Sequence, residues 1–178
     1  NFLFFFNQSE IAADGHPKKG DFLPPIPFPR RMWAGSRVEF IQPILVGQEL
    51  RRVSEISDIQ FKHGKNGELY FVTVNHFIYA NDELVIKEQQ DIVYKPETII
   101  TNNVSATTTP VESTRRNYCF KQQHSVDTTA LFRYSALTFN GHKIHYDRPY
   151  AMQVEGYPGL VVHGPLLATL LMQTLQDK

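Results

Sequence analysis

The chain has 178 residues, of which 42% are hydrophobic and 20% are charged, the balance of an ordinary globular protein with one domain or two small ones. Its formal net charge is zero, which excludes a charge-driven partnership with nucleic acid or with an acidic membrane. The single cysteine, Cys119, excludes a disulfide framework and a cysteine-based zinc site, and no apolar run is long enough to span a bilayer. One cysteine also fits a reducing compartment, so we expect a cytoplasmic protein, or a mitochondrial one if the source is eukaryotic.

The first residues read as irregular chain. Phe2–Phe6 is apolar but short and follows no basic segment, so it does not read as a signal peptide. Because the chain starts without a methionine, we expect further residues upstream. Residues 23–29 are rich in proline and must be extended, since proline fixes φ and removes donors. Arg30, Arg31 and Trp33 follow, as either a surface strap pinned by the indole or a basic, aromatic lip for an anionic ligand.

Residues 37–94 are predicted to form antiparallel strands. Leu69–Ala80 is the clearest, because the period of two puts a set of apolar side chains and one histidine on one face: Tyr70, Val72, Val74, His76 and Ile78. We interpret His76 as a packed strand histidine. Residues 84–94 alternate likewise, with hairpin turns predicted at 63–67 and at 81–82. Residues 49–61 have apolar positions three apart, which also fits a helix, but their β-branched residues favour a strand.

Residues 98–110 differ from the rest in being rich in Thr, Asn and Ser and poor in large apolar side chains. Such a segment has too little apolar surface to offset the entropy of ordering, so we expect a poorly ordered linker. It divides the chain into a first module, 1–95, a linker, 96–113, and a second module, 114–178.

The second module is predicted to open with a strand at Tyr118–Val126. Asp127 can then cap the N-terminus of a short helix that carries Phe132, Ala136 and Leu137 on one side. After this helix comes a polar segment that contains the candidate catalytic residues.

That polar segment carries Asn140, His142 and His145 at spacings of two and three. Gly164 and Pro165 stand where the next helix should start. The helix, 166–176, has an apolar stripe at positions 166, 167, 170, 171 and 175, which must be buried against the first module or a C-terminal sheet that the given sequence lacks. We favour the missing sheet. Imidazoles that face a helix N-terminus have the chemistry to move a proton and to stabilise an oxyanion.

The order Asn140-x-His142-x-x-His145, with Gly-Leu-Val-Val-His-Gly-Pro at 159–165, resembles the MaoC-like hydratase/dehydratase family. Residues 132–147, and also 14–17 and 29–35, are most similar to its fungal type 2 hydroxyacyl-thioester dehydratases and its bacterial mesaconyl- and itaconyl-CoA hydratases. The resemblance implies an α+β double hotdog, two modules that each wrap an antiparallel sheet around a long helix, here apparently truncated at both ends. Asn140 departs from the usual aspartate and His142 from the usual asparagine, and the closer relatives share both changes.

The resemblance further implies a hydro-lyase that reversibly hydrates an enoyl thioester. Its catalytic residues would be His145 and Asn140, the imidazole as the base and the amide as a group that orients water or the ring. The N–H of Gly164 would hold the thioester oxyanion, because Pro165 has no N–H to offer. The plainer alternatives are a structural turn histidine and a glycine that only permits the helix to start.

Substrate-binding roles are predicted for His142, His163 and Arg148. Arg148 follows His145 closely and is our choice to hold a second carboxylate of the acyl group, although a solvated surface charge is the plainer alternative. Asp147 is the nearby carboxylate that could replace the missing aspartate, but we expect it to pair with Arg148 or to cap a turn. No acidic residue lies at ligand spacing from these histidines, so no metal is expected, and no cofactor is implied.

The expected partner is an acyl-CoA or acyl-carrier thioester, and a homodimer is compatible with the resemblance. A hotdog thioesterase is an alternative enzyme, but it needs a carboxylate to activate water, and the Asn140 loop offers none. A non-catalytic subunit that binds acyl thioesters is an alternative from another class, supported by the missing aspartate.

Overall fold

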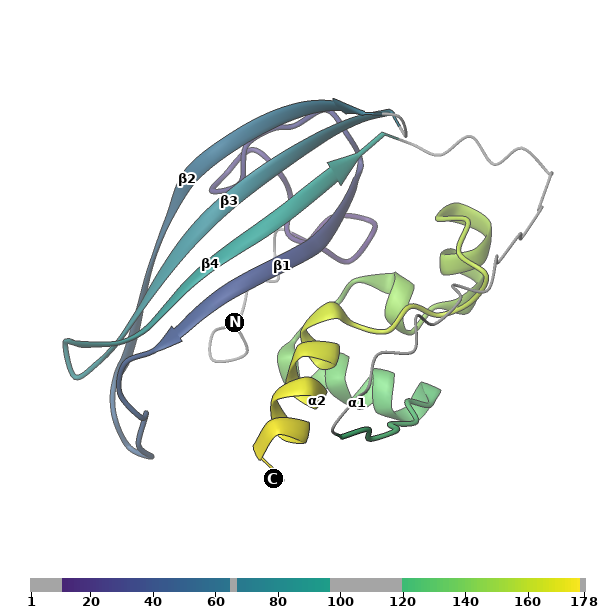
Figure 1. The fold of residues 1–178 in the computed structure, drawn as a ribbon. Coiled ribbons are helices and arrows are strands. Elements are labelled where there is room, and N and C mark those ends of the chain that lie inside the picture. Colours follow the sequence, from purple (N-terminus) through teal and green to yellow (C-terminus); the bar gives the residue numbers. More distant parts are fainter. Residues whose placement is uncertain (1–10, 65–66, 97–119, 177–178) are drawn as a thin grey trace. The chain divides into compact units, whose positions relative to one another are not determined.

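The computed structural model describes residues 11–64, 67–96 and 120–176. By their internal contacts the residues form two compact units (Figure 1). We call Lys18–Glu97 the sheet unit, and Asn1–Pro17 together with Thr98–Lys178 the histidine unit. The predicted linker at 98–110 lies outside the described residues, and the module boundaries at 95 and 114 stay predictions.

The sheet unit is an antiparallel four-stranded sheet with the order β1-β4-β3-β2 (Figure 1). Its strands are β1 (Arg30–Phe40), β2 (Leu50–Gly64), β3 (Gly67–Ala80) and β4 (Glu83–Lys95). The strand assignment for residues 49–61 is thus confirmed. Asn81 and Asp82 have φ of 48° and 67°, the left-handed pair that a tight two-residue hairpin needs. The irregular surface strap expected at Arg30–Trp33 is wrong, because these residues pair with β4 as the start of β1. The alternative of a basic, aromatic lip for an anionic ligand stays a prediction.

One face of the sheet carries the core of this unit. Val72 and Val74 of β3 and Tyr94 of β4 are fully or almost fully buried, and Ile26 from the proline-rich segment packs on them. Every second residue of β3 from Val72 to Ala80 is buried, which confirms the predicted inward face. The extended proline-rich segment therefore supplies an apolar cover for its own sheet.

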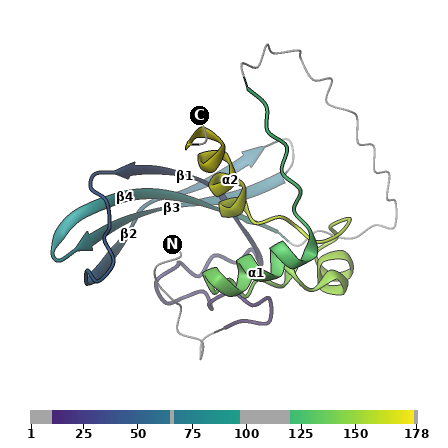
Figure 2. The ribbon, with the colours of Figure 1, turned by 90° about the horizontal axis from the view of Figure 1, so that it is seen from below.

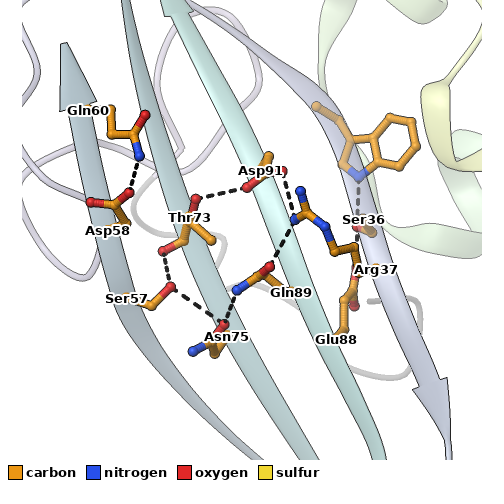
Figure 3. Close-up of polar contacts among 11 residues, drawn as sticks. Ser36, Arg37, Ser57, Asp58, Gln60, Thr73, Asn75, Glu88, Gln89 and Asp91 are labelled. Atoms are coloured by element: carbon orange, nitrogen blue, oxygen red, sulfur yellow. Dashed lines mark hydrogen bonds and ion pairs between the residues drawn. The ribbon is translucent and has the colours of Figure 1, made fainter.

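The opposite face also carries Phe71 and Phe77, but between them it is polar and has cross-strand hydrogen bonds (Figure 3). Arg37 donates from Nη1 to Gln89 Oε1 at 2.8 Å and pairs with Asp91 at 3.2 Å. Asp91 also accepts from the Thr73 hydroxyl at 2.8 Å. An antiparallel sheet with one apolar and one polar face is the arrangement that the alternating sequence predicts.

The histidine unit is built from short helices and irregular chain (Figure 2). Its elements are α1 (Thr128–Thr138), η2 (Lys143–His145), η3 (Tyr150–Val154) and α2 (Gly164–Gln176). Asp127 caps α1 as predicted, because its carboxylate accepts from the backbone N–H of Ala130 at 2.8 Å. The helix ends at Phe139, whose φ of 55° turns the chain, and the Asn140 N–H then bonds to the Ser135 carbonyl at 2.9 Å.

Two local predictions for the segment before the histidines need correction. Residues 120–126 form no strand, and the rest of the expected strand lies outside the described residues. The buried residues of α1 are Leu131 and Ser135, whereas Phe132 and Leu137 are 62% and 78% exposed. The buried side follows Ser135 because its hydroxyl bonds to a buried histidine.

The helix α2 begins at Gly164, two residues before the predicted start, and it buries none of its described residues. Within the predicted apolar stripe, Leu166 and Leu170 are half-buried, whereas Leu167, Leu171 and Leu175 are exposed. Among the residues that the structure describes, no helix is long and apolar enough to cross a membrane.

Candidate active site

The loop after α1 is shaped by the side chain of Asn140. Its Oδ1 accepts from the backbone N–H of His142 at 3.0 Å, which closes a turn of the type that Asn and Asp side chains favour. This bond uses one lone pair of the amide oxygen, and the NH₂ group on the same amide can donate to a ligand. The turn also brings His142 to the short helix η2, which ends at His145.

His145 is buried and its tautomer is set by the backbone. Its Nδ1 lies 2.8 Å from the Val161 carbonyl oxygen, and because a carbonyl only accepts, Nδ1 carries the hydrogen. The Val161 N–H donates in return to the Ile144 carbonyl at 3.0 Å, so the two segments are bound to each other in both directions. The remaining ring nitrogen, Nε2, has a lone pair and no hydrogen-bond partner among the described residues.

His163 lies against His145 and is 0% exposed. The two rings are stacked with centroids 3.7 Å apart and planes at 19°. His163 Nε2 lies 2.8 Å from the Ser135 hydroxyl of α1, while its Nδ1 is buried with no partner in the part of the chain described here. An unpaired buried polar atom costs about 1–3 kcal/mol, and native proteins retain such atoms mainly where function requires them.

Both stacked rings are neutral at neutral pH. The pKa of His145 is lowered to about 4, mainly by burial. The hydrogen bond to the Val161 carbonyl acts to raise this pKa, and the charge of His16 lowers it by a smaller amount. Burial, and then the charge of His145, lower the pKa of His163 to about 3. His145 is therefore a free base with an uncommitted nitrogen.

Two site neighbours come from the N-terminal segment. The ring of His16 lies with its centroid 3.8 Å from that of His142, and Asp14 lies beside it. Asp14, His16 and His142 each offer one possible metal ligand, and these atoms lie within 4.8 Å of one another. Sequence spacing around the histidines missed this carboxylate because it is far away along the chain. The available signal was the Asp-Gly-His-Pro segment at 14–17, which we interpreted only as part of the family resemblance.

The other predicted residues are placed as follows. Gly164 is the first residue of α2, where N–H groups have no acceptor within the helix, and the His163 carbonyl accepts the first helical bond from Leu167. Arg148 is exposed and forms no ion pair with a described residue. Asp147 caps a turn, as predicted, because it accepts from the Tyr150 N–H at 3.0 Å.

The structure thus brings His142, His145 and His163 together, with Asn140 and Gly164 in the segments that carry them. Arg148 is in the same unit but outside this group of rings. The roles assigned to these residues stay predictions.

Comparison with solved structures shows the class of fold. A MaoC-like dehydratase matches with a TM-score of 0.57 at 15% identity, over 80% of this chain and 53% of that one. HtdX from Mycobacterium tuberculosis matches with a TM-score of 0.55 at 14% identity, over 95% of this chain and 58% of that one. The fold is therefore the α+β hotdog fold of the MaoC-like proteins, as the sequence predicted.

Comparison of sequences then gives the family. The family model described as hydroxyacyl-thioester dehydratase type 2 matches residues 1–178, and the chain belongs to this family. A mesaconyl-C(4)-CoA hydratase from Chloroflexus aurantiacus is 51% identical over 93% of this chain and 58% of that protein. The mitochondrial hydroxyacyl-thioester dehydratase type 2 of Schizosaccharomyces pombe is 27% identical over 97% of this chain and 64% of that protein. The chain spans 58% to 65% of the length of the curated relatives it matches.

Proposed function

We propose that the protein is a hydro-lyase that adds water reversibly to the double bond of an enoyl thioester. The observation that carries this proposal is the state of His145. Its Nδ1–H is held by the Val161 carbonyl and its Nε2 has no partner among the described residues, which is the arrangement of an oriented general base. Membership of the hydroxyacyl-thioester dehydratase type 2 family supports the same reaction.

In the proposed step, water attacks Cβ of the enoyl group while His145 Nε2 takes its proton. The electron pair of the double bond moves through Cα to the thioester oxygen. The N–H of Gly164, at the positive end of α2, stabilises the negative charge that develops there. The imidazolium of His145 then returns the proton to Cα, so that one water molecule has been added. The NH₂ group of Asn140 orients the water.

The acyl carrier in this proposal is coenzyme A, and the acyl group bears a second carboxylate. The support is the 51% identity to a protein named mesaconyl-C(4)-CoA hydratase, since mesaconic acid has two carboxyl groups and only one of them forms the thioester. Arg148 is the cation that we assign to the distal carboxylate, because it lies three residues after the end of η2 and forms no ion pair with a described residue.

The experiment follows the ultraviolet absorbance of the enoyl thioester for mesaconyl-CoA and for crotonyl-CoA, which lacks the second carboxylate. The proposal predicts loss of absorbance without release of free thiol, and faster turnover of the dicarboxylic substrate. Release of CoA thiol would indicate a thioesterase instead. Tight binding of both thioesters without turnover would indicate a non-catalytic binding subunit.

The variant Arg148→Gln tests the substrate assignment separately. It should raise KM for mesaconyl-CoA much more than for crotonyl-CoA, because only the first substrate loses an ion pair. Equal effects on the two substrates would show that Arg148 does not bind the distal carboxylate, and they would not bear on the reaction type.

A further inference from the structure

We propose that Asp14 and His16 are positioning residues of this site, which supply through His142 the carboxylate that the Asn140 loop lacks and one further imidazole. The inference rests on the proposed hydration at His145. In it, Asp14 fixes the ring of His16, and His16 in turn fixes His142 and adds its charge to the field around His145.

The first observation is that both carboxylate oxygens of Asp14 are directed at His16. Oδ1 accepts from the backbone N–H of His16 at 2.9 Å, and Oδ2 lies 3.2 Å from its Nδ1. Because a carboxylate only accepts, Nδ1 of His16 carries the hydrogen in this pair. The two side chains are a quarter exposed or less, so this ion pair is partly shielded from water.

The second observation is how the turn is attached to the catalytic loop. Gly15 has φ of +87°, and a Cβ built on it would lie 1.7 Å from the carbonyl oxygen of Gly141. A Cβ on Gly141 would likewise lie 2.8 Å from the Gly15 oxygen. The Lys143 N–H also donates to the Asp14 carbonyl at 3.0 Å. Backbone therefore meets backbone here, and glycine at both positions is what permits the approach.

The third observation is a continuous series of rings. The centroids of His16 and His142 are 3.8 Å apart, those of His142 and His145 are 5.6 Å apart with planes at 90°, and His163 stacks on the far side of His145. The titratable groups around His145 are thus His142 on its own loop, His163 before α2 and His16 from the turn. The charge of His16 lowers the pKa of His145, so a change at the turn reaches the base.

A divalent metal ion is the competing use of Asp14, His16 and His142, whose ligand atoms are close enough to share one. The geometry favours the hydrogen-bonded pair, because both oxygens of Asp14 already face His16. Without that carboxylate, two imidazoles are fewer ligands than a zinc site uses.

The test uses Asp14→Asn, which keeps the turn-closing oxygen but removes the charge, and His16→Gln, which removes the titrating ring. Asp147→Asn is the matched control, since Asp147 also caps a turn through Oδ1 but forms no hydrogen bond or ion pair with any histidine in the described part of the chain. We expect kcat/KM on an enoyl-CoA to fall about tenfold or more in the first two variants and to stay within about twofold in the control.

A second readout does not depend on substrate. In His16→Gln the pKa of His145, followed by ¹⁵N NMR of the histidine rings, should rise above its wild-type value because a neighbouring charge is gone, and the acid limb of kcat/KM should move to higher pH with it. If the wild-type protein hydrates no enoyl thioester, the proposed function is wrong. If the titration of His145 is unchanged in His16→Gln, the positioning role of Asp14 and His16 is wrong. A requirement for added Zn²⁺ that Asp14→Asn abolishes would also overturn it, in favour of a metal site.

Discussion

Each unit buries histidines, and the comparison between them separates a structural histidine from a chemical one. In the sheet unit, His76 has both ring nitrogens engaged, Nδ1 by the Ser54 hydroxyl at 2.7 Å and Nε2 by the Gln90 carbonyl oxygen at 3.1 Å. In the histidine unit, His145 has one nitrogen engaged and one without a partner among the described residues. In His163, the buried Nδ1 likewise has no hydrogen-bond partner among the described residues.

Burial and pKa alone do not make this distinction. Burial lowers the pKa of His76 as it lowers that of His145, and the two side chains are 6% and 7% exposed. What differs is whether a ring nitrogen is left for another molecule. A fully satisfied ring has nothing to offer to a substrate, whereas a ring held at one nitrogen is oriented and still reactive.

The largest expected effect is the loss of activity on removal of His145, and the same substitution at His76 tests the contrast between the two histidines. His145→Ala should reduce hydration on the order of 10²–10⁴-fold, because the general base is lost. His76→Ala should leave kcat of the folded protein near wild type but lower the free energy of unfolding by about 1–3 kcal/mol, because Ser54 and Gln90 lose their partner. Steady-state kinetics and denaturant unfolding on both variants are the measurements. An active His145→Ala protein would refute the assignment.

A pair of glycine substitutions tests the attachment of the turn to the catalytic loop. Gly15→Ala should lower kcat/KM about tenfold or more, because the added Cβ collides with the Gly141 carbonyl and displaces His16 from His142. Gly20→Ala is its control in the sheet unit, since it has a similar φ of +98° but the nearest atom lies at 4.0 Å. Equal losses of activity in both variants would trace the effect to backbone strain and not to the displaced rings.

Asn140→Ala should have a smaller effect, a loss of about tenfold or less, because an orienting amide is less exclusive than a base. The substitution also removes the bond to the His142 N–H and so loosens the loop. Comparison of Asn140→Ala with Asn140→Asp separates the two contributions, since aspartate keeps the acceptor and loses the NH₂ group. If Asn140→Ala is inactive while His145→Ala works, the two roles are exchanged.

The last effect concerns stability against pH and does not involve catalysis. His145 has a folded-state pKa of about 4, below the value of about 6.5 expected for the unfolded chain. Its contribution to stability is therefore fully present above pH 6.5 and is lost as the pH falls from 6.5 toward 4, by up to about 3 kcal/mol. Thermal unfolding should show Tm falling over this interval, less steeply in His145→Ala than in wild type. Identical slopes in the two proteins would contradict the low pKa.

The sequence predicted the sheet unit well because its information is local. Alternation in β3, the turn at Asn81–Asp82 and the composition of 49–61 each indicate a strand or hairpin within a few residues. The exception is Arg30–Trp33, where a strand begins without an alternating pattern, and only pairing with β4 defines it.

The candidate site was only partly predictable because its contacts are not local. The positions of Asn140, His142 and His145 follow from one short segment, and so does the Asp127 cap of α1. The partners of those rings follow from tertiary structure alone: Ser135, the Val161 carbonyl, Asp14 and His16. The buried side of α1 was mistaken for the same reason, because a hydroxyl that binds His163 overrides the apolar pattern of Phe132 and Leu137.

The central claim is that His145 is an oriented neutral base with Nε2 free, in contrast to His76. The most direct measurement is ¹⁵N NMR of the histidine ring nitrogens as a function of pH, with and without a non-reactive acyl-CoA analogue. We expect a hydrogen on Nδ1 of His145, a pKa of about 4, and a shift of its Nε2 signal on binding of the analogue, while the signals of His76 do not change. A hydrogen on Nε2, a pKa near 6.5, or a ring that does not respond to the analogue would show that His145 is not the oriented base.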